Sequence, residues 1–401
     1  MTVPRRVVAL AAACAAAGGR AWLVGGCVRD DLRGEPVKDI DVEVHGLSAE
    51  DLVHALRRVG HARQVGRSFS VWKLRDGSGD IDVALPRGDL PAAPEAALME
   101  ALRHRDLTVN ALARDPLSGA LVDPYGGQQD LADRRLREVD PRTFLDDPVR
   151  ALRAVQLASR LGFTLAPSLV ALCRQAPLQG TPSERIWIEV EKWLLRSPAP
   201  SVGLRLGQQT GVWGQVLPEV AALDPDAASA ALDRAATRRD TLPEPRGLAL
   251  LLGALLHQAT EAAAIATLDR LGVYTWAGYP LRAALQIAVG RWPELTAART
   301  DPELRLLAED AEIALVAEIA WAATGARVAL DNRARAEALG AGYGPLPPLL
   351  YGRDLQRIGV PSGPEMGKLL REVRAAQIQG TVLSPDQALT WVQERLRKTP
   401  C

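Results

Sequence analysis

Aspartates recur at every second position in two short segments that are rich in β-branched residues. Asp39 and Asp41 lie in the segment DIDVEV, and Asp82 lies in the segment DIDVAL. On a strand, side chains two residues apart point the same way about 7 Å apart, and a paired strand lies about 5 Å away. The three carboxylates therefore converge if their strands pair. Two Mg²⁺ ions bound by them would serve phosphoryl transfer, whereas the alternative is a hydrated acidic sheet face.

A glycine pair precedes the first two aspartates. Gly25 and Gly26 separate an apolar strand, predicted over 21–24, from a helix predicted to stop at Gly34. Glycines let backbone N–H groups approach a phosphate, and the beginning of a helix favours its negative charge. A glycine pair alone is a weak signal. Followed by Arg29 and then by the two aspartates, it favours a nucleotide site over a bare acidic face.

The stretch GGCVRDDLRGEPVKDIDVEV resembles the signature of the class II tRNA nucleotidyltransferase and bacterial poly(A) polymerase family, within the polymerase-β-like nucleotidyltransferase superfamily. The resemblance implies that Asp39 and Asp41 hold the catalytic Mg²⁺ ions. It also implies that Gly25, Gly26 and Arg29 bind the triphosphate of the incoming nucleotide. Asp82 stands where the superfamily carries a third catalytic carboxylate.

A second stretch, RHRDLTVNALA, resembles the ribose-recognition motif of the same family. The resemblance implies nucleotide-binding roles for Arg105, Asp106 and Asn110. A carboxylate can accept hydrogen bonds from ribose hydroxyls, which is how a site prefers ribonucleotides. The structural alternative is that Asp106 caps a helix and Asn110 bonds the backbone. The family usually has Arg or Lys at position 104, where this chain has His104.

A third stretch, DPVR at 147–150, resembles the protein template with which the family reads the incoming base. Asp147 and Arg150 are three residues apart and so share one helical face. The resemblance implies that the carboxylate accepts from the cytosine N4 amino group while the arginine donates to O2 and N3. Arg153 continues the basic face, and Gln156 replaces the family's next arginine. Alternatively, Asp147 is only an N-cap before a helix that begins with proline.

Two later stretches carry weaker resemblances. Residues 351–373 resemble the tail of bacterial family members, which implies docking of tRNA, whereas a bare helical hairpin is the alternative. Residues around His257 resemble helices of HD phosphohydrolases. His257 is followed by Gln258 rather than by Asp, so we expect a helical core there and no hydrolase.

The elements around these motifs predict an α+β fold. We expect a polymerase-β-like nucleotidyltransferase head with a small mixed β-sheet, followed by an all-helical neck, body and tail, because strand signals vanish after about residue 130. The predicted domains are a catalytic head over 1–115, a neck with the base template over 116–196, a helical body over 197–340 and a tRNA-binding tail over 341–401.

The composition of the chain bears on the cellular compartment in which it works and on the partners that it binds. Among the 401 residues, no stretch approaches the roughly 20 uncharged apolar residues of a membrane span. The four cysteines show no ligand spacing, which predicts a reducing cytoplasm rather than disulfides or zinc. The net charge is zero, which argues against a chain coated in basic surface for bulk nucleic-acid binding.

The motifs are compatible with several activities. The length of the interval between two of the motifs favours one of these activities. Only 22 residues separate Asp82 from Arg105. In the family, a shortened loop here is associated with enzymes that add only CC. We therefore predict a template-independent enzyme that adds CMP from CTP to the 3′ end of tRNA and releases pyrophosphate. The alternatives are complete CCA addition or A addition with ATP, a poly(A) polymerase, a nucleotidyltransferase with a non-tRNA target, and an inactive RNA-binding relative.

Overall fold

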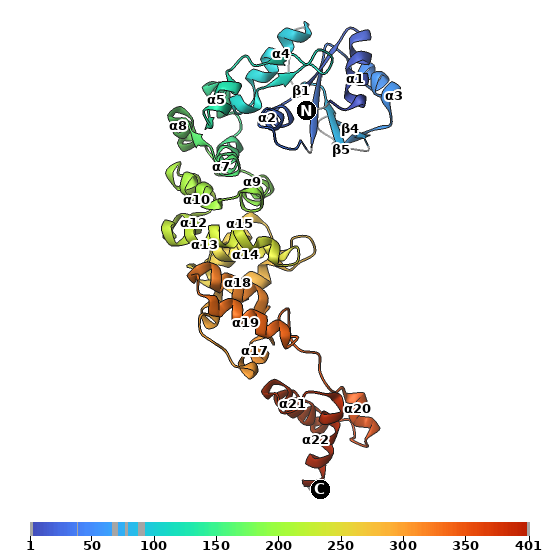
Figure 1. The fold of residues 1–401 in the computed structure, drawn as a ribbon, viewed down its shortest axis with the longest axis vertical. Helices are drawn as coiled ribbons and strands as arrows, with labels where there is room; N and C mark the ends of the chain where they lie inside the picture. The colour runs from blue at the N-terminus through green and yellow to red at the C-terminus, as the bar shows by residue number, and fades with distance from the viewer. Residues whose placement is uncertain (1–2, 38, 66–70, 77–78, 87–92, 399–401) are drawn as a thin grey trace. The chain divides into compact units, whose positions relative to one another are not determined.

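The computed structural model describes residues 3–37, 39–65, 71–76, 79–86 and 93–398 (Figure 1). The chain forms two compact units. The first comprises Met1–Thr181 with Gln209–Val212, and the second comprises Pro182–Gln208 with Trp213–Cys401. The division into head, neck, body and tail at residues 115, 196 and 340 stays a prediction.

The first unit contains a mixed seven-stranded sheet in the order β3-β4-β5-β2-β1-β6-β7 (Figure 1). Its strands are β1 Arg20–Val24, β2 Ile40–His45, β3 Ala62–Val65, β4 Val71–Asp76, β5 Gly79–Ala84, β6 Ala113–Arg114 and β7 Leu121–Val122. Strands β2 and β5 run parallel, and the other neighbouring pairs run antiparallel. The small mixed sheet predicted from the sequence is confirmed. The sequence Asp76-Gly77-Ser78-Gly79 predicts a hairpin turn, and Gly77 and Ser78 lie outside the described residues.

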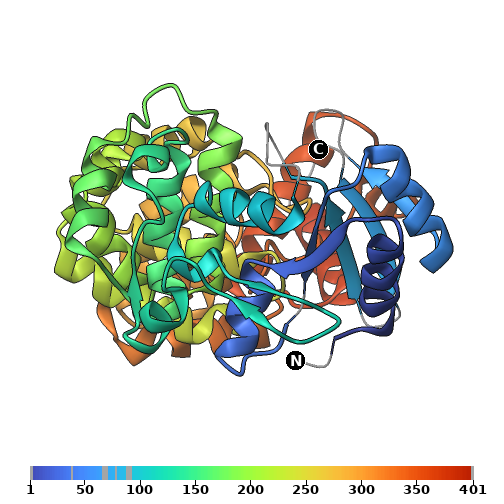
Figure 2. The ribbon, with the colours of Figure 1, turned by 90° about the horizontal axis from the view of Figure 1, so that it is seen from above.

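Alternation along the strands decides which face of the sheet is covered. Val42 and Val44 of β2 join a core with the helices α1 and α3, whereas Asp41 and Glu43 face the other way. On that other face, Trp22 packs with residues of α4. Figure 2 shows the strands between α1 and α3 on one side and α4 on the other. The helices of this unit are α1 Arg5–Ala16, α2 Gly26–Leu32, α3 Ala49–Val59, α4 Pro94–Arg103, the 3₁₀ helix η1 Thr108–Asn110, α5 Gly127–Ala132, α6 Pro141–Phe144, α7 Val149–Leu161 and α8 Pro167–Gln175.

Short strands interrupt the region that the sequence predicts to be helical. Strand β7 lies there, and β8 Arg135–Leu136 pairs in parallel with β9 Thr164–Leu165. Strands of two residues have no measurable hydrophobic period, so pattern reasoning does not detect them. The helices around them agree with the predicted α+β class.

The second unit is built from helices. They are α9 Ser183–Arg196, α10 Pro200–Gln209, α11 Val212–Val216, α12 Pro218–Ala221, α13 Pro225–Arg238, η2 Arg239–Thr241, α14 Arg246–Leu255, α15 Glu261–Leu271, α16 Leu281–Arg291, η3 Trp292–Thr296, α17 Asp301–Leu307, α18 Ile313–Thr324, α19 Arg327–Ala338, α20 Gly352–Arg357, α21 Pro364–Gln379 and α22 Pro385–Lys398. Within it, Glu318 is fully buried and pairs with Arg238, whose Nε lies 2.6 Å from Oε2, and with Arg333. Buried charges require such partners.

His257 at the end of α14 has the surroundings of a core residue. Its Nδ1 lies 2.8 Å from the carbonyl oxygen of Ala254, and its ring packs edge-on against Trp292. Burial lowers the pKa of His257, so the ring is held in its neutral form. These contacts agree with the helical core expected at this position.

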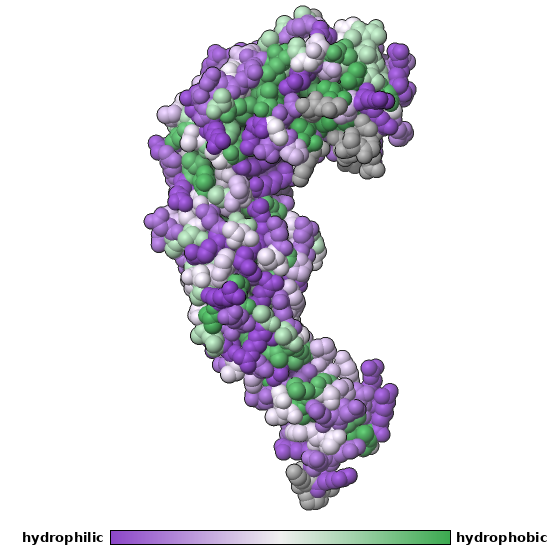
Figure 3. All heavy atoms as spheres, in the orientation of Figure 1, coloured by the Kyte–Doolittle hydropathy of each residue, from purple (hydrophilic) through white to green (hydrophobic). Residues whose placement is uncertain are grey.

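The surface of both units is mixed in character. The face drawn in Figure 3 carries hydrophilic residues along both units, together with hydrophobic residues that gather mainly on the head. Among the described residues, none of the helices combines the length and the apolar character needed to cross a membrane.

Candidate active site

The sheet brings the three predicted carboxylates near enough for Asp39 and Asp82 to act electrostatically on Asp41. Asp41 and Asp82 are direct partners in the parallel pairing of β2 with β5, and Asp39 precedes β2 by one residue. The pKa of Asp41 is raised, chiefly because the surrounding protein desolvates its carboxylate, and further because Asp82, Asp39 and Glu43 repel its charge. Arg105 acts in the opposite direction. Asp41 and Asp82 therefore lie side by side on paired strands, whereas convergence of all three carboxylates around a cation stays a prediction.

The chemistry of these side chains fits a divalent cation. Carboxylate oxygens are the ligands that Mg²⁺ prefers, and a cation would relieve the repulsion at Asp41. The buried Oδ1 of Asp82 accepts no hydrogen bond within the described part of the chain, and Lys73 Nζ lies 3.3 Å from it. No group of three or more His, Cys, Asp or Glu side chains among the described residues is arranged around one point that could hold an ion. Metal ligation by Asp39 and Asp41 therefore stays a prediction.

The glycine turn lies against one of the predicted nucleotide-binding arginines. Gly25 has a φ of 74°, a conformation that glycine adopts without steric cost. A Cβ atom at this position would lie 2.6 Å from Nη1 of Arg105. Gly26 begins α2 directly afterwards. The pair thus lets the backbone come close to a guanidinium group, which places a positive charge beside the turn.

Four of the predicted nucleotide-binding residues form one hydrogen-bonded chain. Arg29 Nη1 donates to Asn110 Oδ1 at 2.6 Å, and Asn110 Nδ2 donates to Asp106 Oδ1 at 3.1 Å. Arg153 Nη1 donates to the other oxygen of Asp106, also at 3.1 Å. Asp30 accepts two bonds from Arg29 at 2.8 and 2.9 Å. The motifs around Arg29, Asp106 and Arg153, which are far apart in sequence, are joined in space.

Asp106 is the centre of this chain and is ionised. Its burial acts to raise the pKa, but Arg153 and the hydrogen bonds from Asn110 and the Leu107 N–H hold the pKa below its ordinary value. Asp106 accepts from the adjacent Leu107 N–H at 2.8 Å, but Leu107 rather than Asp106 is the N-cap of η1, so this bond is not the helix cap of the structural alternative. Asn110, in contrast, bonds side chains rather than the backbone through its amide group.

Removing the amide that joins the two halves of this chain is expected to destabilise the head. Asn110→Ala leaves the buried Arg29 without one acceptor and Asp106 without one donor, so the free energy of unfolding should fall by about 1–3 kcal/mol. Urea denaturation followed by circular dichroism measures the change. Gln129→Ala, which removes an exposed amide from α5, is the control and should cost less than about 0.5 kcal/mol. Equal losses for the two variants would contradict the connecting role of Asn110.

Sequence reasoning assigned no role to Glu43, which positions Arg105. Arg105 Nη2 donates to Glu43 Oε2 at 3.0 Å, and the buried His45 places Nε2 2.8 Å from Oε1 of the same carboxylate. Burial acts to raise the pKa of Glu43, but His45 and Arg105 hold it below its ordinary value. The available signal was the alternation of β2, because Glu43 shares the face of Asp39 and Asp41. Lys73, beside Asp82, was also missed.

The predicted base-reading pair lies where α7 begins. Arg150 donates from Nη1 to the carbonyl of Thr143 at 2.8 Å and from Nη2 to the carbonyl of His104 at 2.7 Å. Asp147 accepts from the Val149 N–H at 3.2 Å, as an N-terminal cap would. The structural alternative thus describes real contacts of Asp147, and base recognition by the pair stays a prediction.

The two departures from the family pattern also lie in this unit. The side chain of His104 is more than half exposed and its Nε2 lies 3.2 Å from Glu100 Oε1. Gln156 is buried within α7, and its Nε2 has no hydrogen-bond partner among the described residues. Gln156 therefore does not present a charge to a ligand at the position where the family has an arginine.

Comparisons with known proteins agree with this geometry. Residues 21–137 match the family model described as "Poly A polymerase head domain". Residues 162–223 match the model described as "Probable RNA and SrmB- binding site of polymerase A". The multifunctional CCA protein of Pseudomonas aeruginosa is 40% identical over 220 residues, which cover 50% of this chain and 51% of that protein. The chain thus spans about half the length of the curated relatives that it matches.

Solved structures extend the similarity along the chain. The CCA-adding enzyme of Bacillus stearothermophilus in complex with CTP is 25% identical, with a TM-score of 0.74 over 98% of each chain. The CCA-adding enzyme of Thermotoga maritima complexed with tRNA is 22% identical, with a TM-score of 0.67 over 96% of this chain and 94% of that one, and supports the fold alone. The matched head, the adjoining RNA-binding region and these relatives thus make the chain similar to poly(A) polymerases and CCA proteins over the matched residues, and similar in fold to a CCA-adding enzyme along nearly its whole length.

Proposed function

We propose that this chain transfers CMP from CTP to the 3′ end of tRNA, without a nucleic-acid template, and releases pyrophosphate. The observation that carries the proposal is the pairing of Asp41 with Asp82 beside the Gly25 turn and Arg105. This arrangement combines acidic ligands for cations with a positively charged turn for a triphosphate. The names of the relatives, which refer to CCA proteins and CCA-adding enzymes, supply the substrate class. The proposal includes a cytoplasmic location, because the curated relatives are bacterial proteins and bacterial tRNA is made in the cytoplasm.

The reaction is an in-line displacement at the α-phosphorus of CTP. The 3′-hydroxyl oxygen of the RNA forms a bond to this phosphorus, the bond to the bridging oxygen breaks, and pyrophosphate leaves with that oxygen. Asp39 and Asp41 would hold divalent ions, with Asp82 as the third carboxylate of the site. When bound there, such ions neutralise the carboxylates and stabilise the charge on the attacking and leaving oxygens.

The remaining residues of the chain bind and orient the nucleotide. Gly25, Gly26, Arg29 and Arg105 face the triphosphate in this proposal. Asp106 accepts from a ribose hydroxyl, because its Oδ2 already accepts from Arg153 and a carboxylate oxygen has room for a second donor. Asn110 keeps Asp106 and Arg29 in place through its two bonds.

Recognition of cytosine is assigned to α7. Asp147 accepts from the N4 amino group, and Arg150 donates to O2 and N3. The two carbonyl groups bound to Arg150 hold its guanidinium in one orientation before a nucleotide arrives. A held donor loses less conformational entropy on binding than a mobile one. The tail helices α20 and α21 are assigned to tRNA binding on the basis of the family resemblance.

The short interval between Asp82 and Arg105 supports the proposed restriction to CC addition. Of its 22 residues, ten belong to α4, and β5 ends at Ala84. Little chain remains for a loop that could rearrange the pocket from cytosine to adenine, although residues 87–92 of this interval lie outside the described residues. Complete CCA addition is the second candidate, because the curated relatives are named multifunctional CCA proteins.

Incubation of the protein and Mg²⁺ with a tRNA that lacks its CCA end tests both candidates. CTP alone is expected to lengthen the RNA by two nucleotides, and addition of ATP should not lengthen that product further. Denaturing gel electrophoresis resolves each product. Extension by three nucleotides with both substrates would replace CC addition by complete CCA addition. A protein that extends the RNA with neither substrate would contradict the proposed function itself.

A further inference from the structure

A row of charged side chains crosses the sheet from its edge to the candidate active site. Arg63 of β3 is paired directly with Lys73 of β4, and Lys73 is paired with Asp82 of β5. Asp82 is in turn paired with Asp41 of β2. Residues directly opposite on paired strands share a face of the sheet. All four side chains therefore belong to the face opposite the one that α1 and α3 cover.

At the edge of the sheet, this row places two positively charged side chains, Arg63 and Lys73, directly opposite each other. Like charges directly opposite each other on neighbouring strands are destabilising. Lys73 has a partner, because its Nζ lies 3.3 Å from Oδ1 of Asp82. Arg63 is exposed and forms no ion pair with any residue in the described ranges. An anion from outside the chain would therefore be attracted to Arg63.

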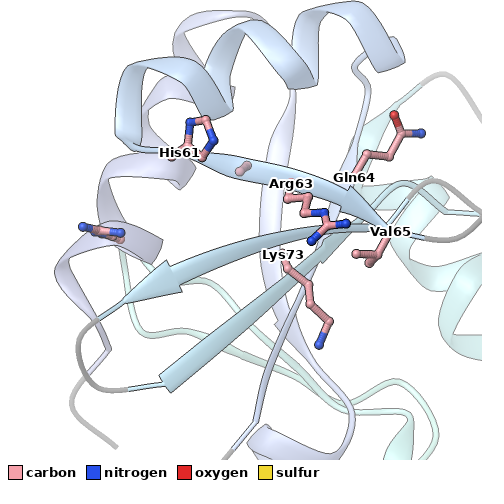
Figure 4. Close-up of a pocket in the computed structure, with 7 residues that line it drawn as sticks. His61, Arg63, Gln64, Val65 and Lys73 are labelled. Carbon is pink, nitrogen blue, oxygen red and sulfur yellow. The ribbon is translucent and has the colours of Figure 1, made fainter.

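The surface around Arg63 is hollowed. A hollow of about 750 Å³ is lined by Arg6, His61, Ala62, Arg63, Gln64, Val65 and Lys73. Figure 4 shows Arg63 and Lys73 close together, with Gln64 pointing away from them. Charged residues on an edge strand also prevent pairing with other chains. That explanation alone does not account for a basic hollow that shares Lys73 with the candidate active site.

The order of the strands places this hollow and the glycine turn on opposite sides of the carboxylates. The basic residues lie on β3 and β4, the carboxylates on β5 and β2, and the glycine turn follows β1. In an in-line displacement, the attacking and leaving oxygens are on opposite sides of the phosphorus. With the triphosphate at the glycine turn, the attacking hydroxyl approaches from the side of β4 and β3. The RNA strand that carries this hydroxyl brings phosphodiester groups with it.

We propose that the hollow at β3 and β4 binds a phosphodiester group of the acceptor strand near its 3′ end. Arg63 is the principal contact, and Lys73 and Arg6 add positive charge around it. Lys73 also connects this contact to Asp82, so that the strand is held beside the carboxylates. The inference rests on the proposed nucleotide transfer, and it adds a positioning site for RNA that is separate from the nucleotide site.

The test compares Arg63→Glu with Arg58→Glu, which makes the same charge change at an exposed position of α3. For Arg63→Glu we expect the KM for tRNA lacking its CCA end to rise about tenfold, while the KM for CTP stays within about twofold. The slope of log KM for RNA against log salt should fall by about 0.7–0.9, the value for one lost phosphate contact. Arg63→Lys should restore most of the RNA affinity. Circular dichroism and thermal unfolding confirm that each variant is folded.

Fluorescence anisotropy with labelled tRNA and no CTP keeps this inference separate from the proposed function. If the wild-type protein transfers no nucleotide, the proposed function fails, but weaker tRNA binding by Arg63→Glu than by Arg58→Glu still supports the hollow as an RNA contact. Equal tRNA binding by these two variants would overturn the inference while leaving nucleotide transfer intact. A rise in the KM for CTP instead of the KM for RNA would also overturn it, because the hollow would then serve the triphosphate.

Discussion

Asp41→Asn is expected to lower kcat for CMP transfer by at least about a thousandfold. The substitution keeps the size of the side chain but removes the charge that lies opposite Asp82 and would hold a cation. Loss of one such electrostatic contribution in an active site commonly costs two to three orders of magnitude, and a lost metal ligand should cost at least as much. Single-turnover transfer from labelled CTP measures the loss.

The stability of this variant provides the control. A raised pKa means that Asp41 contributes stability while it is protonated, below its unfolded pKa, and that this contribution is lost as the pH rises through the folded pKa. At pH 7 and without added metal, removal of the charge should leave the free energy of unfolding unchanged or higher. Asp331→Asn, at an exposed position of α19, should change neither activity nor stability. Activity of Asp41→Asn within tenfold of the wild type would contradict the metal assignment.

Arg150→Ala is expected to reduce the preference for CTP over UTP by about 10- to 100-fold, with a smaller effect on kcat for CTP. Cytosine and uracil differ in the groups at positions 3 and 4, where the proposed pair of Arg150 and Asp147 donates and accepts. A site that hydrogen-bonds a base discriminates because the wrong base leaves buried polar groups unpaired. Values of kcat/KM measured with each nucleotide alone give the ratio.

A nearby arginine serves as the matched control for this second variant. Arg142 is highly exposed and pairs with Asp140, and the substitution Arg142→Ala should leave the ratio of CTP to UTP unchanged. An unchanged ratio in Arg150→Ala would show that this arginine only joins Thr143 to the segment around His104. Equal losses of kcat/KM for both nucleotides would lead to the same conclusion.

Local signals in the sequence were sufficient for much of the head. The alternation in β2 predicted a strand with Asp41 on one face and Val42 on the other, and the structure confirms it. Ser48, followed by Glu50 and Asp51, is typical of a residue that caps the beginning of a helix, and its side chain accepts from the Asp51 N–H in α3. Such features depend on neighbours along the chain, so residue type and spacing are sufficient to predict them.

Features that depend on distant partners were beyond the sequence. Nothing in the alternation of two strands specifies that they pair in parallel or that Asp41 meets Asp82 rather than a neighbour, because register depends on the whole sheet. The bonds of Glu43 to Arg105 and of Arg29 to Asn110 likewise join positions more than 60 residues apart. Motif reasoning placed Arg29, Arg105 and Asn110 in one site without showing how they are held together.

The parallel pairing of β2 with β5 also bears on how the protein is made. The 40 residues between Asp41 and Asp82 include α3, β3 and β4, and this whole segment must cross over before the two strands can meet. Closing such non-local pairings is slow because chain entropy is lost before contacts are gained. A nascent chain that has not yet emerged through β5 lacks half of this carboxylate pair, so the ability to bind ligands through both arises only once β5 has paired with β2.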